Sequence, residues 1–316
     1  MLDGETVLVT GAAGFLGAWV VRAVEAAGGR ALPTCRDVTN AWRLEGVSAR
    51  PRRLDVRDSA SIESVFAEER PLHVIHCAAA GVDPRYRDAA LELDVNLHGS
   101  LRLIEAAARR GVERFLHIGS CFEYAGRLGR ICEDGALVPT GSYGASKAAA
   151  TIVMRERALH FGLSLVAVRP FALWGPGEGL HRLVPQVLAA CRERKPLALT
   201  LCEVVRDYSY VEDVAHSLVS LLRARLPEPV LTVNLGSGEP RRLRDFVLEI
   251  ARELEGEAWL RFGELPARSH EPRSLVACTC RLVDLIGERI QTPLVEGLRR
   301  MEGLEWARAW AVGPGR

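Results

Sequence analysis

The sequence predicts an α/β fold, a doubly wound parallel sheet followed by a smaller C-terminal α/β lobe. Short β-branched apolar runs alternate with helix-length segments over the first half of the 316 residues, which is typical of parallel sheets. A glycine-rich turn joins the first run to the first helix. The chain is 48% hydrophobic with a net charge of +1, which favours a sizeable core and argues against a nucleic-acid-binding protein.

Each expected strand is a short apolar run, and each expected helix carries apolar or alanine positions at helical spacing. The strands of the first half are expected at residues 6–10, 31–35, 49–54, 72–78, 115–119 and 163–168. The helices between them are expected at residues 15–27, 59–69, 86–110 and 142–161. Beyond Trp174 the pattern changes, and the later elements are a strand at 231–234 and helices at 243–254 and 294–301.

The glycine turn Gly11-Ala-Ala-Gly14-Phe-Leu-Gly17 lies between a strand and a helix. Glycines there let the backbone approach a pyrophosphate, and the helix N-terminus offers unpaired N–H groups and a partial positive charge. Gly17 would let helix and strand pack tightly. This context predicts a dinucleotide-binding domain of the Rossmann type; the alternative is a plain strand–turn–helix whose glycines serve packing.

The end of the second strand bears on which dinucleotide is bound. An acidic residue there suits NAD, and an arginine suits the 2′-phosphate of NADP. The sequence is Thr34-Cys35-Arg36-Asp37, so the acidic position falls on Cys35 with Arg36 next, although a shift of two residues would bring Asp37 there. We therefore expect NADP(H) in preference to NAD(H), with Arg36 as a cofactor residue.

Two lobes are expected. The dinucleotide-binding domain covers 1–175, with 204–235 returning to it, and the substrate-binding lobe covers 176–203 and 236–316. No apolar run reaches the length of a membrane helix, and the N-terminus lacks the basic start of a signal peptide. The eight cysteines include no C-x-x-C pair. A cytoplasmic protein with reduced thiols and no metal site is expected.

Tyr143 and Lys147 lie four residues apart in an alanine-rich helix, and therefore on one helical face. Lys147 and Lys195 are the only lysines, which makes this spacing informative. A nearby ammonium stabilises a phenolate and would make Tyr143 a usable proton donor or acceptor. Ser120 follows the strand expected at 115–119, at the sheet edge where ligands bind, and would hold a substrate oxygen. The alternatives are a surface tyrosine, a solvated lysine and a turn-forming serine.

Together these motifs resemble the extended short-chain dehydrogenases/reductases, in the NAD-dependent epimerase/dehydratase group that handles nucleotide-activated sugars. The resemblance covers nearly the whole chain. Besides the motifs above, it rests on Leu54-Asp55-Val56, His76-Cys77-Ala78-Ala79, Asp94-Val95-Asn96-Leu97-His98-Gly99, Arg169-Pro170 through Trp174-Gly175-Pro176, Arg206-Asp207-Tyr208, Val211-Glu212-Asp213-Val214 and Asn234-Leu235-Gly236-Ser237-Gly238.

The resemblance implies a role for each matched position. Tyr143 would be the general acid/base, Lys147 would bind the nicotinamide ribose and lower the Tyr143 pKa, and Ser120 would orient the reacting sugar oxygen. The other cofactor residues that it implies are Phe15 and Leu16 in the glycine loop, Asp55 and Val56 at the adenine, Ala78, Ala79, Asn96 (which would support the active site), Pro170 and Leu173. The substrate residues that it implies are Ser120, Cys121, Phe122, Ala172, Arg206 and Arg268, the two arginines holding the nucleotide phosphates.

Departures from the family's pattern bear on the reaction. Sugar 4,6-dehydratases similar to this protein carry an Asp-Glu pair directly after the Ser/Thr, whereas this chain has Cys121 and Phe122. Phenylalanine cannot move a proton, so 4,6-dehydration is disfavoured. Glu123 lies one residue further on and is expected to point elsewhere. Ala172 stands where the family often has asparagine, and the end of the second strand favours exchangeable NADPH and hence net reduction.

The leading expectation is a 4-ketoreductase of an NDP-4-keto-6-deoxyhexose in deoxysugar biosynthesis, with hydride from NADPH and the proton from Tyr143. The runner-up is an NDP-sugar 4-epimerase with tightly bound NAD, which would use the same tyrosine twice. An NADPH reductase of a non-sugar carbonyl and a non-catalytic cofactor-sensing module are further alternatives. By the resemblance, helices 86–110 and 142–161 would form a homodimer interface; no nucleic-acid or membrane partner is expected.

Overall fold

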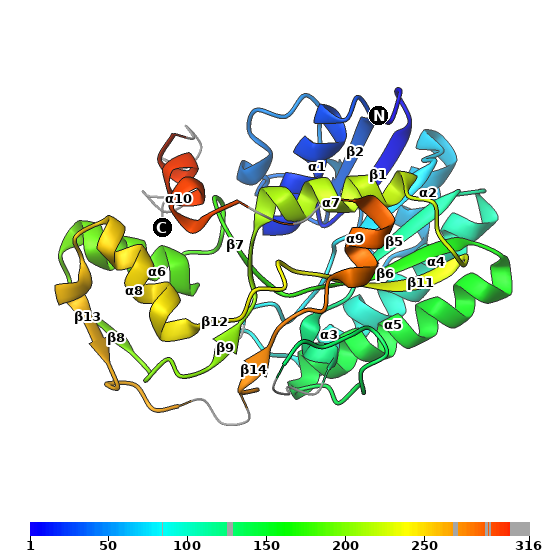
Figure 1. Ribbon diagram of the computed structural model, residues 1–316. Coiled ribbons are helices and arrows are strands. Elements are labelled where there is room, and N and C mark those ends of the chain that lie inside the picture. The colour runs from blue at the N-terminus through cyan, green and yellow to red at the C-terminus, as the bar shows by residue number, and fades with distance from the viewer. Residues whose placement is uncertain (84, 125–128, 268–270, 288–289, 291, 304–316) are drawn as a thin grey trace.

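A seven-stranded parallel sheet forms the centre of the molecule, with the strand order β11-β6-β5-β4-β1-β2-β3 (Figure 1). The computed structural model describes residues 1–303 except 84, 125–128, 268–270, 288–289 and 291. The strands of this sheet are β1 (Thr6–Thr10), β2 (Arg30–Cys35), β3 (Arg52–Arg53), β4 (His73–His76), β5 (Arg114–Ile118), β6 (Ser164–Pro170) and β11 (Val230–Leu235). All neighbouring pairs run parallel, which confirms the expected fold class.

Helices cover both faces of the sheet, because successive side chains of a strand point to opposite faces. On β1, Val7 and Val9 pack with α1 and α7, whereas Leu8 packs with α2, α4 and α5. Leu282 of α9 adds to the first of these two cores. The bounds of these helices are α1 (Phe15–Ala26), α2 (Ser59–Glu69), α4 (Ser100–Arg109), α5 (Gly141–Phe161), α7 (Val211–Arg223) and α9 (Cys280–Ile286).

A smaller lobe lies beside the sheet, on the left of Figure 1. It is built from α6 (Leu183–Glu193), α8 (Leu243–Glu253), α10 (Leu294–Gly303), β8 (Leu197–Leu199) and β13 (Leu260–Phe262). Its own core includes Trp174, Tyr210 and Phe246, and Tyr208 stacks on Phe246 with 3.9 Å between ring centroids. No helix in the described ranges is both long enough and apolar enough to cross a membrane.

Short strands join the lobe to the sheet. β7 (Ala172–Trp174) pairs with β10 (Tyr208–Tyr210), and β9 (Val205–Arg206) lies between β12 (Arg241–Arg242) and β14 (Ser274–Leu275). The segment 204–235 therefore divides: its first residues form β9 and β10 in the small sheets, while α7 and β11 belong to the layers of the large sheet. The division into two lobes near residue 175 stays a prediction.

Two expected elements differ from the structure. The single helix expected over 86–110 begins at α3 (Ala89–Leu93), because the Asp88 carboxylate accepts a hydrogen bond from Leu91 N and caps it. It then opens into a π-helical turn, η2 (Asp94–Gly99), before α4 continues. The strand expected over 49–54 contributes only β3, preceded by Pro51, which has no N–H to donate.

Candidate active site

The candidate site lies along the carboxyl edge of the sheet. The glycine loop follows β1, Ala78 follows β4 and Ser120 follows β5. The strand order reverses between β1 and β4, and in such sheets ligands bind outside the strand ends at this reversal. The fold therefore brings these three segments to one place, although they are far apart in the sequence.

The glycine loop forms a cradle that side chains would fill. Gly11 has φ +65°, and a Cβ there would lie 2.6 Å from Ala78 N. A Cβ on Gly17 would lie 2.3 Å from the Gly11 carbonyl oxygen. Gly14 is the N-cap of α1, and no side chain caps that end. The backbone N–H groups of the first turn, which begins at Phe15 and Leu16, therefore remain available to an anion, so the cradle fits the pyrophosphate of a dinucleotide.

Arg43, which the sequence analysis missed, ties this cradle to the loop after β7. Its guanidinium donates to Gly177 O at 2.7 Å and to Ala13 O at 3.3 Å, and it lies 4.2 Å from the centre of the Trp42 ring. Trp19 of α1 donates to Pro176 O at 2.9 Å. The loop is thus held against the cofactor cradle. No sequence signal singles out Arg43, because arginine is the common cation of this chain.

At the end of β2, Cys35 is buried, and both Arg36 and Asp37 are exposed. The Asp37 carboxylate accepts hydrogen bonds from Thr39 N at 2.9 Å and Thr39 Oγ1 at 2.6 Å, which lower its pKa. Asp37 is therefore engaged within its own turn. Hydrogen bonds from Arg57 lower the pKa of Asp55, and the charge of Arg36 lowers it further. Arg36 therefore lies near Asp55.

Ser120, Tyr143 and Lys147 come together between β5 and α5. The Ser120 side chain lies close enough to the Tyr143 phenol to act on its pKa. Ser120 Oγ also accepts from Phe122 N at 3.2 Å. Lys147 is 2% exposed, and its Nζ donates to the Ile118 carbonyl oxygen at 2.5 Å. The phenol and the ammonium thus lie in the first two turns of one helix, α5, beside the serine.

Burial governs the pKa values of this group. It lowers the pKa of Lys147 to about 8, against the opposing charge of Glu123. It raises the pKa of Tyr143, and the Ser120 side chain only partly offsets that rise. Desolvation of the phenolate thus dominates the Tyr143 pKa, and the Lys147 ammonium is directed to a backbone carbonyl, so the expected lowering of the Tyr143 pKa by Lys147 stays a prediction.

Asn96 links the cofactor side of the site to the helix of Tyr143. Its Oδ1 accepts from Ala80 N at 2.8 Å, and its Nδ2 donates to Ala80 O at 3.1 Å and to Ser146 Oγ at 2.9 Å. Ser146 in turn donates to the Tyr143 carbonyl oxygen at 2.9 Å. Asn96 lies in the π-helical turn η2, and such turns often mark functional sites.

The residues after Ser120 form the short helix η3 (Cys121–Glu123). Phe122 packs edge-on against Tyr143 with 6.5 Å between ring centroids and is 37% exposed, so it borders the site. Cys121 is buried, which raises its pKa to about 12. Glu123 turns away into the core, in keeping with the expectation.

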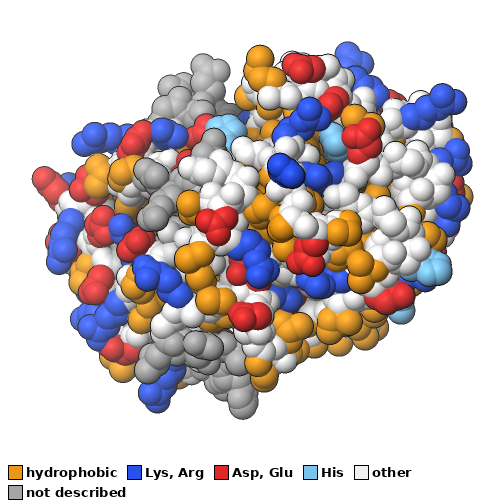
Figure 2. Space-filling view, turned by 45° about the vertical axis from the view of Figure 1, so that its right-hand side comes forward, with side chains coloured by type: hydrophobic (Ala, Val, Ile, Leu, Met, Phe, Trp, Pro, Cys, Tyr) orange, Lys and Arg blue, Asp and Glu red, His pale blue; other side chains and the backbone are white. Residues whose placement is uncertain are grey.

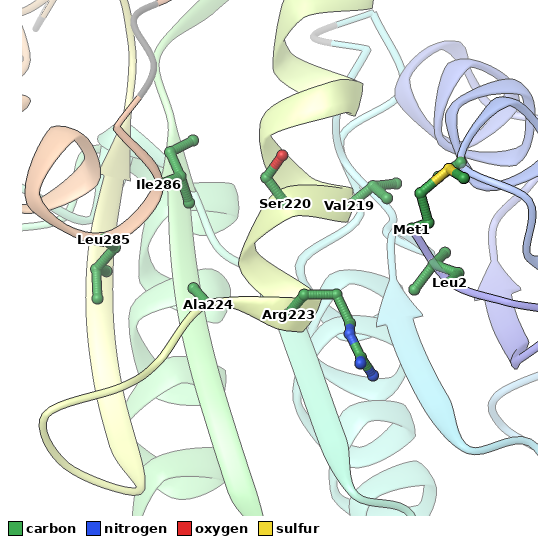
Figure 3. Close-up of a pocket in the computed structure, with 9 residues that line it drawn as sticks. Met1, Leu2, Val219, Ser220, Arg223, Ala224, Leu285 and Ile286 are labelled. Atoms are coloured by element: carbon green, nitrogen blue, oxygen red, sulfur yellow. The ribbon is translucent and has the colours of Figure 1, made fainter.

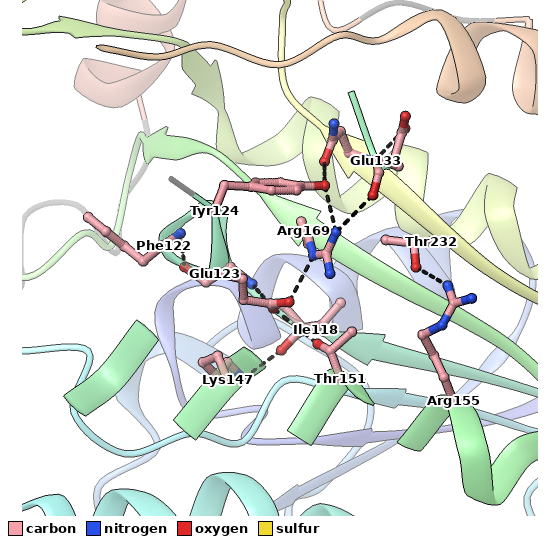
Figure 4. A network of polar contacts seen from close by, with 12 residues as sticks. Ile118, Phe122, Glu123, Tyr124, Glu133, Lys147, Thr151, Arg155, Arg169 and Thr232 are labelled. Carbon is pink, nitrogen blue, oxygen red and sulfur yellow. Dashed lines mark hydrogen bonds and ion pairs between the residues drawn. The ribbon is translucent and has the colours of Figure 1, made fainter. Parts of the chain in front are cut away.

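A buried polar network holds Glu123 in place (Figure 4). Its carboxylate accepts from Arg169 Nε at 2.8 Å, Thr151 Oγ1 at 3.0 Å and Ser120 N at 2.8 Å. Arg169 also donates to the Tyr124 hydroxyl at 2.7 Å. Burial raises the pKa of Glu123, while the charge of Arg169 opposes that rise. Glu123 therefore fixes the Ser120 turn from behind and does not face Tyr143.

Arg206, expected at the substrate phosphates, lies in β9 and is 8% exposed. Its guanidinium donates to Glu271 at 2.9 Å and to Val205 O at 2.8 Å. The adjacent Asp207 is buried and accepts four hydrogen bonds, from Ser237 N, Ser237 Oγ, Gly238 N and Ala277 N. Asp207 thus anchors the strand of Arg206.

The remaining expected residues occupy several places. Ala172 and Leu173 lie in β7, directly after Pro170 ends β6, and Ala79 lies in the loop after β4. Val56 is buried, and Gly99 lies so close that a Cβ on it would be 2.7 Å from Val56 Cγ2. Arg268 lies outside the described residues.

The sequence analysis also missed Arg87. Its guanidinium lies 5.6 Å from the centre of the Tyr143 ring and 3.5 Å from a carboxylate oxygen of Glu92. Glu92 is 1% exposed and contacts the turn at Gly81. Arg87 therefore covers the tyrosine from the loop after β4. The sequence does not single out Arg87, because arginine is the common cation of this chain.

Two pockets lie away from this site. One, of about 320 Å³, is bounded by Leu2, Arg223 and Ile286 at the amino edge of the sheet (Figure 3). The other, of about 340 Å³, lies beside the network of Figure 4 and is lined by Arg155 and Arg169. Neither is lined by Ser120, Tyr143 or Lys147. In the part of the chain that the structure describes, no three His, Cys, Asp or Glu residues could hold a metal ion together.

Comparison with known proteins agrees with this geometry. A family model described as the NAD dependent epimerase/dehydratase family matches residues 7–236. This chain belongs to that family. It is 31% identical to a dTDP-glucose 4,6-dehydratase of Neisseria meningitidis over 68% of this chain and 67% of the relative. It is 28% identical to a UDP-glucose 4-epimerase of Azospirillum brasilense over 96% of this chain and 92% of the relative.

A solved structure of an epimerase/dehydratase relative is also similar. The Thermus thermophilus UDP-glucose 4-epimerase complex with NAD has a TM-score of 0.83 at 28% identity, covering 93% of this chain and 97% of that one. The resemblance to extended short-chain dehydrogenases/reductases and the class of NAD(P)-dependent oxidoreductase-type enzyme are thereby confirmed.

Proposed function

We propose that this enzyme transfers hydride at a carbon of a nucleotide-activated sugar without eliminating water. The observation that carries the proposal is the contact between Ser120 and Tyr143 next to a site wall formed by Phe122. Phe122 and Cys121 stand where dehydratases of this family carry their acid and base. Glu123 is bound by Arg169 and Thr151 and is therefore unavailable as a substitute.

The proposal assigns each residue a task. Tyr143 gives its phenolic proton to the carbonyl oxygen, or takes it from the hydroxyl in the reverse direction. Ser120 donates a hydrogen bond that orients that oxygen. Lys147 supplies a positive charge one helical turn away, which favours the phenolate when the proton has left. Asn96 keeps the start of α5 against the cofactor side through Ser146.

The cofactor would lie over the glycine cradle of Gly11, Gly14 and Gly17, with Lys147 at the nicotinamide ribose. When bound, the nicotinamide supplies or accepts the hydride. We assign the preference to NADP(H), because Arg36 is exposed near Asp55 while Asp37 is engaged with Thr39. A guanidinium at this point would pair with a 2′-phosphate.

With NADP(H) as the cofactor, the proposed reaction is the reduction of an NDP-4-keto-6-deoxyhexose, which is a 4-ketoreductase activity. Arg206 would hold the nucleotide diphosphate, exchanging its partner Glu271 for a phosphate. Binding energy from the diphosphate would then orient the sugar at Tyr143.

A second candidate is an NDP-sugar 4-epimerase with tightly bound NAD. The similarity to the Azospirillum and Thermus UDP-glucose 4-epimerases, which extends over more than nine-tenths of this chain, favours it. An epimerase needs the same Ser120–Tyr143 pair and retains its cofactor between turnovers. The two candidates therefore differ in cofactor exchange rather than in catalytic residues.

Purified protein distinguishes them. A ketoreductase is expected to arrive largely free of cofactor and to oxidise NADPH with an NDP-4-keto-6-deoxyhexose. An epimerase is expected to carry NAD(H), visible by absorbance after denaturation, and to interconvert UDP-glucose and UDP-galactose without added cofactor. Activity in neither assay, with elimination of water from dTDP-glucose instead, would contradict the proposal.

We also propose a homodimer through α4 and α5. Ile152, Leu159 and Phe161 of α5 are exposed, at 57%, 62% and 38%. Figure 2 shows hydrophobic side chains gathered along the lower right edge of the molecule, and α5 runs along the lower right in Figure 1. Light scattering is expected to give twice the mass of the 34.6 kDa chain. A mass of one chain at micromolar concentration would exclude this dimer.

A further inference from the structure

Three of the eight free cysteines meet at the surface, away from the cofactor cradle. Ile131 and Ala277 pair as a parallel bridge, in which Ile131 N donates to Val276 O at 2.8 Å and Cys278 N donates to Ile131 O at 2.9 Å. Cys132 and Cys278 are the next residues on the two paired segments. Their side chains therefore leave neighbouring backbones on the same side.

The three thiols of this group lie near enough to shift one another's pKa. A hydrogen bond to the Cys280 backbone lowers the pKa of Cys278, and the neighbouring Cys132 and Cys280 thiols lower it further, whereas the pKa of Cys132 rises to about 11. The carboxylates that face them are Glu133, Asp134 and Asp284, and their charges oppose ionisation.

Exposure separates this group from the other thiols. Cys132 and Cys280 are exposed and Cys278 is half-buried, whereas Cys35, Cys121, Cys191 and Cys202 are buried. A dissolved oxidant can therefore reach the group without local unfolding. Thiolate character together with access is what makes a cysteine susceptible to oxidation.

We propose that Cys132 and Cys278 form a reversible disulfide, which makes this pair a thiol-oxidation site separate from the catalytic residues. Neighbouring paired backbones lie about 4.8 Å apart, within the range of roughly 4.4–6.8 Å that a disulfide requires between Cα atoms. The bridge between Ile131 and Ala277 therefore places the two cysteines within reach of each other. Cys280 is a third thiol that contacts Cys278 but does not lie on the paired backbone.

Hydrogen peroxide is a sufficient oxidant. The Cys278 thiolate attacks one peroxide oxygen, an S–O bond forms, the O–O bond breaks, and hydroxide leaves and is protonated to water. The Cys132 thiolate then attacks the Cys278 sulfur, the S–S bond forms and the S–O bond breaks, releasing a second water. Two thiols are oxidised and one peroxide is reduced, and an external dithiol reverses the step.

The disulfide would connect two segments that serve the site. Cys132 follows η3, the helix that begins at Ser120. Cys278 follows Ala277, whose N–H donates to Asp207 beside Arg206. Oxidation is therefore expected to hold the anchor of Arg206 against the Ser120 side of the sheet and to raise the midpoint of thermal unfolding.

Peptide mapping of the full chain tests the proposal. Protein is treated with a few equivalents of peroxide, alkylated and digested with trypsin without reduction. The expected product is a crosslink between peptides 131–147 and 274–281, lighter by two hydrogens and released by dithiothreitol. Alkylation of Cys132 and Cys278 after peroxide treatment, or a crosslink between two chains, would overturn the proposal.

Cysteine variants identify which sulfur is crosslinked to Cys132, because Cys278 and Cys280 share one tryptic peptide. C280S is expected to keep the crosslink, and C278S to lose it. In the double variant C132S/C280S, dimedone is expected to label Cys278, because no neighbouring thiol remains to resolve the sulfenic acid there. C191S is the control, with a buried thiol far from the group, and should behave as wild type. Loss of the crosslink in C280S with retention in C278S would show that Cys132 pairs with Cys280 and would overturn the proposal.

Discussion

Ser120 and Tyr143 lie side by side in the candidate site, and each is positioned by its own contacts. The turn of Ser120 is fixed by the Glu123 carboxylate, which accepts from Ser120 N. Tyr143 is held from two sides, by Phe122 edge-on and by the guanidinium of Arg87. These contacts restrict the phenol ring beside Ser120, and proton transfer to a bound oxygen requires such positioning.

Tyr143→Phe is expected to lower kcat by roughly 10²–10⁴-fold, the usual contribution of a positioned general acid. Cofactor binding should change little, because the hydroxyl is the only group removed. The measurement is steady-state turnover with the substrate that the assays above identify. Tyr86→Phe is the matched control, since Tyr86 is 74% exposed. Undiminished turnover in Tyr143→Phe would remove this residue from the mechanism.

Lys147 is expected to make stability depend on pH. Burial lowers its pKa to about 8 in the folded state, from 10.5. Between those values the unfolded chain binds more protons than the folded one, so stability rises with pH across that window. Below about pH 8 Lys147 is protonated in both the folded and the unfolded state, so the full free-energy cost of burying its ammonium is present.

The measurement for Lys147 compares urea unfolding of wild type and Lys147→Met from pH 7.5 to 10.5. Wild type is expected to gain about 3 kcal/mol relative to the variant across the window. Lys195→Met is the control, because Lys195 is exposed and paired with Glu193. A constant difference between wild type and Lys147→Met would show that the amine is not strained by burial.

At the scale of elements, the close approach of α5 to η3 decides the geometry of the site. Gly144 allows it, because a Cβ there would lie 2.5 Å from the Phe122 carbonyl oxygen. On the other side of α5, the π-helical turn η2 directs Asn96 toward both Ala80 and Ser146. The close backbone contact at Gly144 and the side-chain amide of Asn96 therefore fix the positions of η3, α5 and η2 relative to one another.

Asn96→Ala is expected to lower the free energy of unfolding by about 1–3 kcal/mol, because the partly buried N–H and C=O of Ala80 lose their partner. Turnover should also fall, since Ser146 and the start of α5 would no longer be positioned. Urea denaturation and kcat are the two readouts. Asn40→Ala, at an exposed position, should leave both unchanged. An unchanged urea midpoint in Asn96→Ala would show that the Asn96 hydrogen bonds do not stabilise the folded protein.

At the scale of the whole molecule, the strand order places the candidate cofactor site, and the loop after β7 packs beside it. The reversal between β1 and β4 leaves room above their carboxyl ends. The loop after β7 then packs over the glycine cradle through Arg43 and Trp19. Ligands that bind there contact both parts of the chain, so they should stabilise the molecule as a whole.

NADPH is expected to raise the thermal unfolding midpoint more than NADH at equal concentration. Ligand at about 100 times its Kd stabilises the folded state by about 2.7 kcal/mol, which is a measurable shift. Arg36→Ala should abolish the difference between the two cofactors, whereas the exposed Arg50→Ala should keep it. A larger shift with NADH in wild type would favour the epimerase candidate instead.

Much of the fold could be predicted because local patterns coincide with the elements. The apolar run 6–10 and the amphipathic segment 59–69 correspond to β1 and α2 residue for residue. The helix expected over 86–110 was less accurate, because a local side-chain cap at Asp88 sets its start and the π-helical turn η2, which packs against α5, interrupts it. Propensity alone does not register the packing of η2.

For the site, sequence spacing placed Tyr143 and Lys147 on one face, since four residues make about one helical turn. The glycines of the loop followed from the need for close backbone approach. The sequence could not indicate Arg43 or Arg87, because their roles come from contacts with residues that are distant in the chain. Nor could it give the direction of the Tyr143 pKa shift, which depends on how completely the folded protein removes the phenol from water.

Local sequence by itself determined the alternation of strands and helices, the glycine cradle, and which residues are candidates for proton transfer. These follow from side-chain period, backbone freedom and functional-group chemistry, which are properties of short segments. Only the tertiary structure decided which side chains meet: Ser120 with Tyr143, Glu123 with Arg169, and Cys132 with Cys278. Those contacts join residues brought together by strand order and burial, and neither is encoded within any one segment.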